Sequence, residues 1–157
     1  MAFAVFFLLF ALYSSTKTSL YYRVEPASAR AQYELNRAAY WLLESPGTPY
    51  DWNSTSVVIP GLAQARLVVD EKRLYNLAEM NYSLLKETLG LSGYEFKFEL
   101  TDANGVIQSA SWQGNTTLAS FGAVAANAYV VRPMKRVVKY RGQPMTLTLV
   151  LSKAVPE

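Results

Sequence analysis

The sequence predicts an α+β fold in which a long N-terminal hydrophobic helix continues into an amphipathic helix packed on a four-stranded antiparallel sheet. Three observations indicate this: an unbroken apolar run near the N-terminus, small apolar residues at three- and four-residue spacing after it, and alternating segments in the C-terminal half. The length of 157 residues fits one domain with one added element. We expect a hydrophobic membrane or filament-core helix over residues 1–25 and an extracytoplasmic α+β domain over residues 26–157.

The composition excludes several kinds of chemistry. The chain has 51% hydrophobic and 17% charged residues, a net charge of +3, and neither cysteine nor histidine. Disulfides, thiolate nucleophiles, imidazole metal ligands and Ser-His-Asp catalysis are therefore excluded. A carboxylate enzyme needs two acids on facing elements, and none of the available acids shows such a pairing. These acids are Asp51, Asp70, Glu71, Glu79, Glu95 and Glu99. We expect no enzyme activity and no catalytic, cofactor-binding or metal site.

The apolar run extends from Ala2 to Tyr13, and the first charge is Lys17. As a helix, residues 1–22 would reach about 33 Å, enough for a bilayer core of about 30 Å. The expected membrane or filament-core residues are Phe3, Phe6, Phe7, Leu8, Leu9, Phe10, Leu12 and Tyr13. A cleaved signal peptide is the first alternative, although no basic residue precedes the run. A helix buried in the core of the domain is the second.

A second helix is expected from Ala27 to Glu44, after an interruption at Pro26. Its apolar stripe consists of small and aliphatic residues, which allow close packing: Ala27, Ala31, Leu35, Ala38, Ala39 and Leu42. Ser45–Pro49 ends the helix, because prolines and a glycine cannot continue it. In the loop that follows, we expect Trp52 to fold inward as an anchor, with carbohydrate stacking as the weaker interpretation.

The remaining segments predict one helix and four strands. Asp70 is a candidate N-cap for a helix that ends at Gly90. The strand signal is strongest in Tyr94–Leu100, where aromatic and charged residues alternate. The other expected strands are 106–112, one within 126–140, and 145–151, mostly joined by hairpins. A short strand over residues 66–69 is a further candidate.

Two passages carry a family resemblance. They are the segment from Trp41 to Trp52 (WLLESPGTPYDW) and the later Gly61-Leu62-Ala63, supported by residues 69–74 and 82–91. This arrangement resembles an archaeal type IV pilin-like protein of the class III signal peptide family. The resemblance implies a type IV pilin-like fold and a subunit of an archaeal pilus-like surface filament, assembled with copies of itself or related subunits through its N-terminal helix. Adhesion is a further role that it suggests.

The resemblance to pilin-like proteins also implies where the protein is located in the cell. We expect a single-pass protein of the cell membrane with its C-terminal domain outside the cell, or a place in an extracellular filament. An anchored scaffold that does not polymerise is the alternative, and its sequence would look nearly the same. A leader upstream of Met1 would favour the filament, because the family's precursors carry one before the apolar run.

Two groups of surface residues are candidate sites. Three Asn-x-Ser/Thr sequons, at Asn53, Asn81 and Asn115, are candidates for N-glycosylation. A basic surface patch is expected from the cluster Arg132, Lys135, Arg136, Lys139 and Arg141. We expect this patch to face anionic headgroups, a negatively charged surface layer or a neighbouring subunit rather than nucleic acid.

Overall fold

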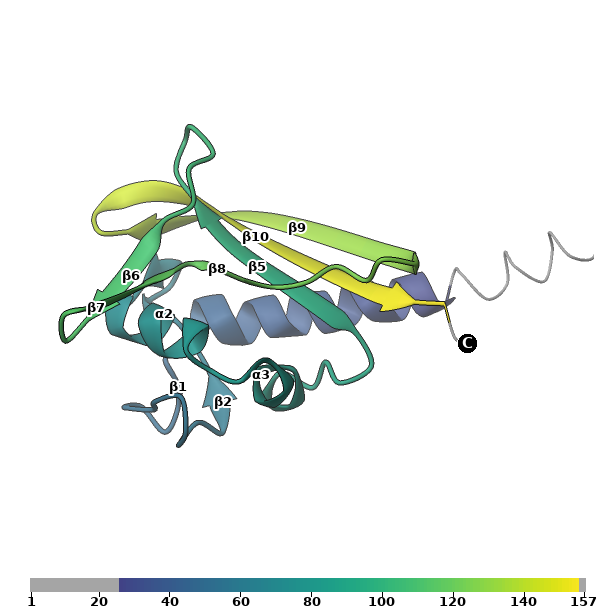
Figure 1. Cartoon of the computed structure of the whole chain (residues 1–157), viewed down its shortest axis with the longest axis horizontal. Helices are drawn as coiled ribbons and strands as arrows, with labels where there is room; N and C mark the ends of the chain where they lie inside the picture. Colours follow the sequence, from purple (N-terminus) through teal and green to yellow (C-terminus); the bar gives the residue numbers. More distant parts are fainter. Residues whose placement is uncertain (1–25, 156–157) are drawn as a thin grey trace, which may run out of the picture.

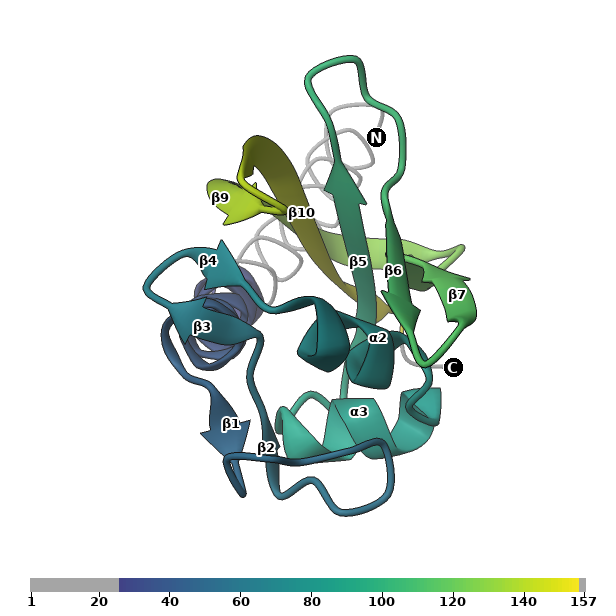
Figure 2. The ribbon, with the colours of Figure 1, turned by 90° about the vertical axis from the view of Figure 1, so that its left-hand side faces the viewer.

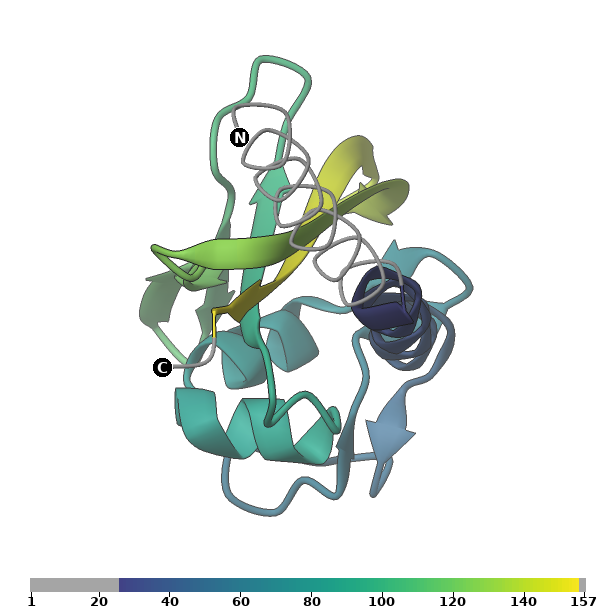
Figure 3. The ribbon, with the colours of Figure 1, turned by 90° about the vertical axis from the view of Figure 1, so that its right-hand side faces the viewer.

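A helix over residues 26–44 runs alongside the strands of a curled sheet (Figure 1). The computed structural model describes residues 26–155. After this helix the elements are β1 (Gly47–Thr48), β2 (Ile59–Pro60), β3 (Ala63–Ala65), β4 (Val68–Val69), α2 (Glu71–Ala78), α3 (Tyr82–Thr88), β5 (Glu95–Thr101), β6 (Ser109–Trp112), β7 (Asn115–Leu118), β8 (Ser120–Gly122), β9 (Ala128–Tyr140) and β10 (Gln143–Ala154). Figures 2 and 3 show β9 and β10 on one side of the molecule, with α3 and the β1–β2 loop on the opposite side.

The main sheet has six strands in the order β3-β4-β9-β10-β5-β8. β10 is antiparallel to both β9 and β5, whereas β4 meets β9 in parallel. β1–β2 and β6–β7 form two separate two-stranded ladders. The sheet is therefore mixed, and strands outweigh helices in the described part of the chain.

This architecture shows that the predicted fold class is wrong. The expected four-stranded antiparallel sheet of a pilin-like fold is replaced by the curled six-stranded mixed sheet. The strand expected at residues 106–112 meets only the end of β5, through a bridge between Ile107 and Thr101, and its later part, β6, pairs with β7. β5 instead lies between β10 and β8. Alternation in a sequence specifies which face a residue occupies but not which strand lies beside it. The hydrophobic helix expected over residues 1–25 lies outside the described residues.

A second correction concerns the single helix expected between Asp70 and Gly90. The structure has two helices there, α2 and α3. The predicted N-cap is confirmed, since Asp70 Oδ1 accepts a hydrogen bond from the Arg73 N–H at 2.9 Å. Asn81 then caps a new helix, because its Oδ1 accepts from the Ser83 N–H at 2.9 Å. An asparagine side chain that satisfies free backbone donors favours a helix start over helix continuation.

The hydrophobic core lies between the 26–44 helix, the inner face of the sheet and the two short helices. The expected stripe of the helix is confirmed, with four members fully buried: Ala31, Leu35, Ala38 and Leu42. Alternation in β5 and β10 is also as expected, with Phe96, Phe98 and Leu100 facing Leu147, Leu149 and Leu151. Phe98 stacks on Phe121 of β8 with ring centroids 4.6 Å apart. The inner face is thus a continuous apolar layer.

One backbone connection joins the helix to the sheet. The Leu67 N–H donates to the Leu43 carbonyl at 3.1 Å, and the Leu67 carbonyl accepts from the Lys139 N–H at 2.8 Å. Nearby, the Leu62 N–H donates to the Leu42 carbonyl at 2.8 Å and the Ala63 N–H to the Ser45 carbonyl at 3.1 Å. The last carbonyl groups of a helix have no hydrogen-bond donor within the helix. Here the backbone N–H groups of Leu62 and Leu67 donate to two of these carbonyls.

The loop after the helix is held by Trp52, whose predicted anchoring role is confirmed. Its ring is 1% exposed, and its Nε1–H lies 2.9 Å from the Pro46 carbonyl and 3.2 Å from the Gly61 carbonyl. Gly47 has φ +89°, and a Cβ there would collide with the Trp52 ring. A Cβ on Gly61 would collide with the Ser45 carbonyl. Glycine is therefore required on both sides of the anchor.

β9 has one edge paired and one edge largely open. It pairs with β10 from Ala128 to Tyr140 with one irregularity at Tyr129, whereas the opposite edge meets β4 at Lys139 alone. The Lys139 N–H points to that open edge, so alternation places the nitrogen of Pro133 there as well. Proline has no N–H to donate, which suits an edge position. The β9–β10 turn at Arg141–Gly142 has φ +49° and +80°, as a tight hairpin requires.

Replacing a buried and an exposed residue of the same helix tests this packing. Leu35→Ala should lower the free energy of unfolding by about 2–5 kcal/mol, because it opens a cavity in the core. Tyr33→Ala, the matched control, changes a side chain that is 64% exposed and should cost less than about 0.5 kcal/mol. Urea unfolding followed by circular dichroism measures both, and equal costs would contradict the described orientation of the helix.

Candidate functional site

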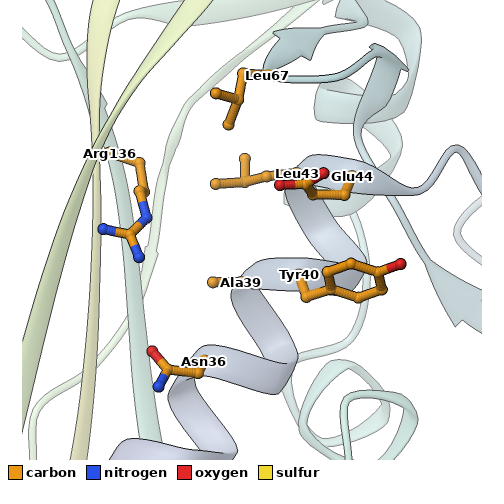
Figure 4. Close-up of a pocket in the computed structure, with 7 residues that line it drawn as sticks. All are labelled: Asn36, Ala39, Tyr40, Leu43, Glu44, Leu67 and Arg136. Atoms are coloured by element: carbon orange, nitrogen blue, oxygen red, sulfur yellow. The ribbon is translucent and has the colours of Figure 1, made fainter.

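A groove of about 300 Å³ lies between the 26–44 helix and β9, and we call it the helix–β9 groove (Figure 4). Its lining is Asn36, Ala39, Tyr40, Leu43, Glu44, Leu67 and Arg136. The helix supplies five of these residues, β9 supplies Arg136, and Leu67 closes the end where the helix and the sheet are joined. The backbone connection through Leu67 therefore lies at one end of the groove.

The helix–β9 groove combines an apolar floor with a few polar groups. Figure 4 shows Arg136 reaching from the strand towards the helix, with the Asn36 amide below it and the Tyr40 ring turned away. Among the described residues Arg136 has no ion pair, whereas Glu44 pairs with Arg66 at 3.2 Å. A guanidinium and an amide over aliphatic side chains can bind an anionic or amphipathic group.

A second polar region lies at the start of α2. Arg141 forms a two-point ion pair with Glu71, whose Oε1 also accepts from the Ser111 N–H at 3.0 Å. The hydrogen bond from Arg141 holds the pKa of Glu71 below its ordinary value, and the carboxylate in turn raises the pKa of Arg141. Burial raises the pKa of Tyr140 to about 12, and its hydroxyl donates to the Ser109 carbonyl at 2.8 Å. These contacts tie the β9–β10 turn to α2 and β6.

A third polar cluster joins α3 to β5. The Tyr82 hydroxyl lies 2.7 Å from Glu95 Oε2 and accepts from the Phe96 N–H at 2.9 Å. Lys86 Nζ lies 2.9 Å from Glu95 Oε1. The hydrogen bond from Lys86, and then that from Tyr82, lowers the pKa of Glu95, while burial raises the pKa of Tyr82. The cluster fixes the short helix against the sheet.

The remaining candidate acids are dispersed over the fold. Asp70 is an N-cap, Glu99 pairs with Lys97 at 2.9 Å, and Asp51 and Glu79 are exposed. Within residues 26–155 no three of the acidic side chains gather into an arrangement that could hold a metal ion.

The five residues of the expected basic patch occupy different environments. Strand alternation turns Arg132 and Arg136 towards the helix, where Arg132 contacts Ser28. Lys135 and Lys139 are exposed on the opposite face of β9, and Arg141 lies in the turn with Glu71. The structure thus brings together only Lys135 and Lys139 as exposed cations on one face.

The three sequon asparagines are all exposed. Asn53 Oδ1 accepts from the Thr55 N–H at 2.9 Å within a loop, Asn81 caps α3, and Asn115 begins β7 beside a turn. Each side chain is accessible, and their glycosylation stays a prediction.

No helix in the described range 26–155 has both the length and the apolar character needed to cross a membrane. For this part of the chain, the finding contradicts the expected single-pass location in the cell membrane. The eight residues from Phe3 to Tyr13 that were expected in the membrane or filament core lie outside that range.

Sequence reasoning did not identify the exposed aromatic residues of the 26–44 helix. Tyr33 is 64% and Tyr40 is 62% exposed, and both lie opposite the buried stripe. Their spacing of seven residues was a signal, because it places two large apolar rings on the polar side of an amphipathic helix. Nothing in the sequence indicated the role of Leu67, which depends on contacts with two distant segments.

Comparison with known proteins finds no match to this chain among protein-family models, curated proteins or solved structures. The resemblance to archaeal pilin-like proteins therefore stays a prediction from the sequence.

The cluster at Glu95 should make stability depend on pH in the acid range. Its folded pKa lies below the ordinary value of 4.5, so the carboxylate stabilises the fold above that pH. This contribution is lost as the pH falls through the folded pKa. Glu95→Gln should therefore lower Tm at neutral pH, and the gap to the wild type should close on acidification.

The control for this experiment is Glu87→Gln on α3, an exposed carboxylate with no ion pair among the described residues. Its Tm should follow the wild type at every pH in calorimetric scans. A gap for Glu95→Gln that does not change with pH would show that the lost stability is not due to the charge of this carboxylate.

Proposed function

We propose that this protein is a structural subunit of a type IV pilus-like filament, assembled with copies of itself or with related chains. The observation that carries this proposal is the outward face of the 26–44 helix. One side of the helix is buried under the domain's own sheet, whereas the other presents Tyr33 and Tyr40 to the outside. This outward face, defined by Ala29, Tyr33, Asn36 and Tyr40, is called the tyrosine face.

The chemistry of the tyrosine face favours binding to another protein. Tyrosine is enriched at the energetic centres of protein interfaces, because it contributes a large rigid area and a polar hydroxyl. Ala29 lies one turn before Tyr33 and Asn36 lies between the two rings, and both side chains are smaller than tyrosine, so a second helix could approach alongside the rings. Both tyrosines exceed 60% exposure, which leaves more than half of their area available for assembly.

The sequence before the helix supports the same function. Residues 2–13 are apolar without interruption and include four phenylalanines. Burying one Phe or Leu side chain is worth about 1.5–3 kcal/mol, so such a run strongly favours an apolar environment. In a filament, other subunits would supply it. Together with the resemblance of residues 41–52 to pilin-like proteins, this makes a filament our preferred form of assembly.

Adding charge to the tyrosine face tests the proposal. The double variant Tyr33→Asp/Tyr40→Asp should raise the protein concentration needed for assembly at least tenfold, which corresponds to about 1.4 kcal/mol. Ultracentrifugal pelleting of the full chain and electron microscopy of the pellet measure this. The desolvation of two carboxylates opposes contact at this face.

The matched control is Val106→Asp, which places the same charge on a side chain that is 58% exposed in the β5–β6 turn. It should assemble as the wild type does, and circular dichroism should show that every variant is folded. A wild-type chain that remains monomeric at all concentrations, or a double variant that assembles normally, would overturn the proposal. The first result would favour a scaffold that does not polymerise.

A further inference from the structure

The charges of the described residues are unevenly distributed along the chain. Residues 128–154, which form β9, β10 and their turn, contain six basic and no acidic residues. Asp51, Glu79 and Glu87 are exposed and make no ion pair among the residues described. They lie in the β1–β2 loop, at the end of α2 and on α3. Figures 2 and 3 place α3 and the β1–β2 loop on the opposite side of the molecule from β9, and Figure 2 shows α2 between them and the sheet.

The basic end is the face of β9 that turns away from the core. Alternation puts Val131, Pro133, Lys135, Val137 and Lys139 on it, and we call this set the β9 outer face. All five residues are exposed, with Val131 at 41% and Val137 at 68%. Two lysines therefore alternate with exposed apolar side chains along one strand.

The opposite end, called the acidic end, combines Asp51, Glu79 and Glu87 with two exposed apolar residues. Tyr50 is 71% and Val58 is 63% exposed in the β1–β2 loop. Both ends thus pair like charges with exposed apolar area, and their charges are opposite in sign.

The basic side chains near the acidic end are already engaged. Arg73 is 7% exposed, donates to the Ala63 carbonyl at 2.7 Å and lies under the Tyr50 ring at 4.7 Å. Lys72 lies over the Trp112 ring at 5.2 Å, and Lys86 pairs with Glu95. Arg73 and Lys72 keep their positive charges, but Asp51, Asp70, Glu79 and Glu87 outnumber them, so this end presents a net negative charge to a partner.

We propose that copies of this chain associate head to tail, with the β9 outer face of one copy against the acidic end of the next. This inference rests on the proposed function and adds a second contact between subunits to the one made by the tyrosine face. Charge complementarity orients the two copies, and the exposed valines and Tyr50 supply apolar contact area. A contact between two different surfaces leaves one of each free, so it extends into a filament unless the rotation closes a ring.

A second copy fits the two surfaces better than an anionic polymer does. A polymer would need the basic face alone and would leave the acidic end, with its exposed Tyr50 and Val58, without a role. A copy of the same chain accounts for both ends with one contact.

Reciprocal charge reversal on the full chain tests this contact. Lys135→Glu/Lys139→Glu makes the β9 outer face acidic, and Glu79→Lys/Glu87→Lys makes the acidic end basic. Each double variant alone should need at least tenfold more protein to assemble, because like charges then meet. An equimolar mixture of the two should restore assembly, since each variant offers the other a complementary surface.

Two controls separate charge from damage to the fold. Lys135→Arg/Lys139→Arg keeps the charge and should assemble normally, and thermal melts should show all variants folded. Wild-type assembly should weaken when salt rises from about 0.1 M to about 1 M, which shortens the Debye length from about 10 Å to about 3 Å. Sedimentation velocity measures each of these.

Each outcome is decisive. Normal assembly of either reversed variant, or a mixture that fails to assemble, would overturn the head-to-tail contact. If that occurs while Tyr33→Asp/Tyr40→Asp still blocks assembly, the proposed filament function stands and only the inferred contact fails. A wild-type chain that never assembles rejects both. Heparin binding that is lost in Lys135→Glu/Lys139→Glu, with self-association unchanged, would assign the β9 outer face to an anionic polymer.

Discussion

The backbone N–H and carbonyl of Leu67 connect the two main parts of this molecule. The N–H binds the Leu43 carbonyl at the end of the helix, and the carbonyl binds the Lys139 N–H at the edge of the sheet. Leu67 adopts φ +58°, an uncommon conformation for a residue of this type, and the hydrogen bonds on both sides hold it there. This connection holds the end of the helix beside the edge of the sheet, and Leu67 also lines the groove between them.

β9 distributes its charges because it is a strand with two different neighbours. Its inward residues, such as Met134 and Val138, fill the core, while Arg132 and Arg136 on the same side reach towards the helix. Lys135 and Lys139 face away. A cluster that is continuous in sequence is therefore two separate surfaces in space, one that lines a groove and one that faces outward. Arg141, the fifth basic residue of this cluster, belongs to neither surface, because it pairs with Glu71 in the turn.

Local features of this fold could be predicted from the sequence, whereas its long-range pairing could not. The alternation of β5, the cap at Asp70, the turn at Arg141–Gly142 and the burial of Trp52 each depend on residues close in the chain. The order of the sheet depends on which strands pair with β5. Nothing in the sequences of β8 and β10 indicates that these two strands are its neighbours. The break between α2 and α3 at Asn81 could not be predicted from the sequence, because apolar residues continue at helical spacing on both sides of it. In the candidate site, Arg136 was identified by its charge, but Asn36 and Leu67 were not, because the groove exists only after helix and sheet meet.

Pro133 limits the pairing of other strands with the open edge of β9. Unpaired strand edges are templates for amyloid, since each free N–H and carbonyl can bind another strand. Pro133 interrupts this row of donors near the middle of β9 and divides it into two short stretches. Uncontrolled stacking of strands is thereby disfavoured, although the side chains of the same strand remain accessible. The β9 outer face can therefore remain exposed and available for binding at high local protein concentration without leading to irreversible aggregation.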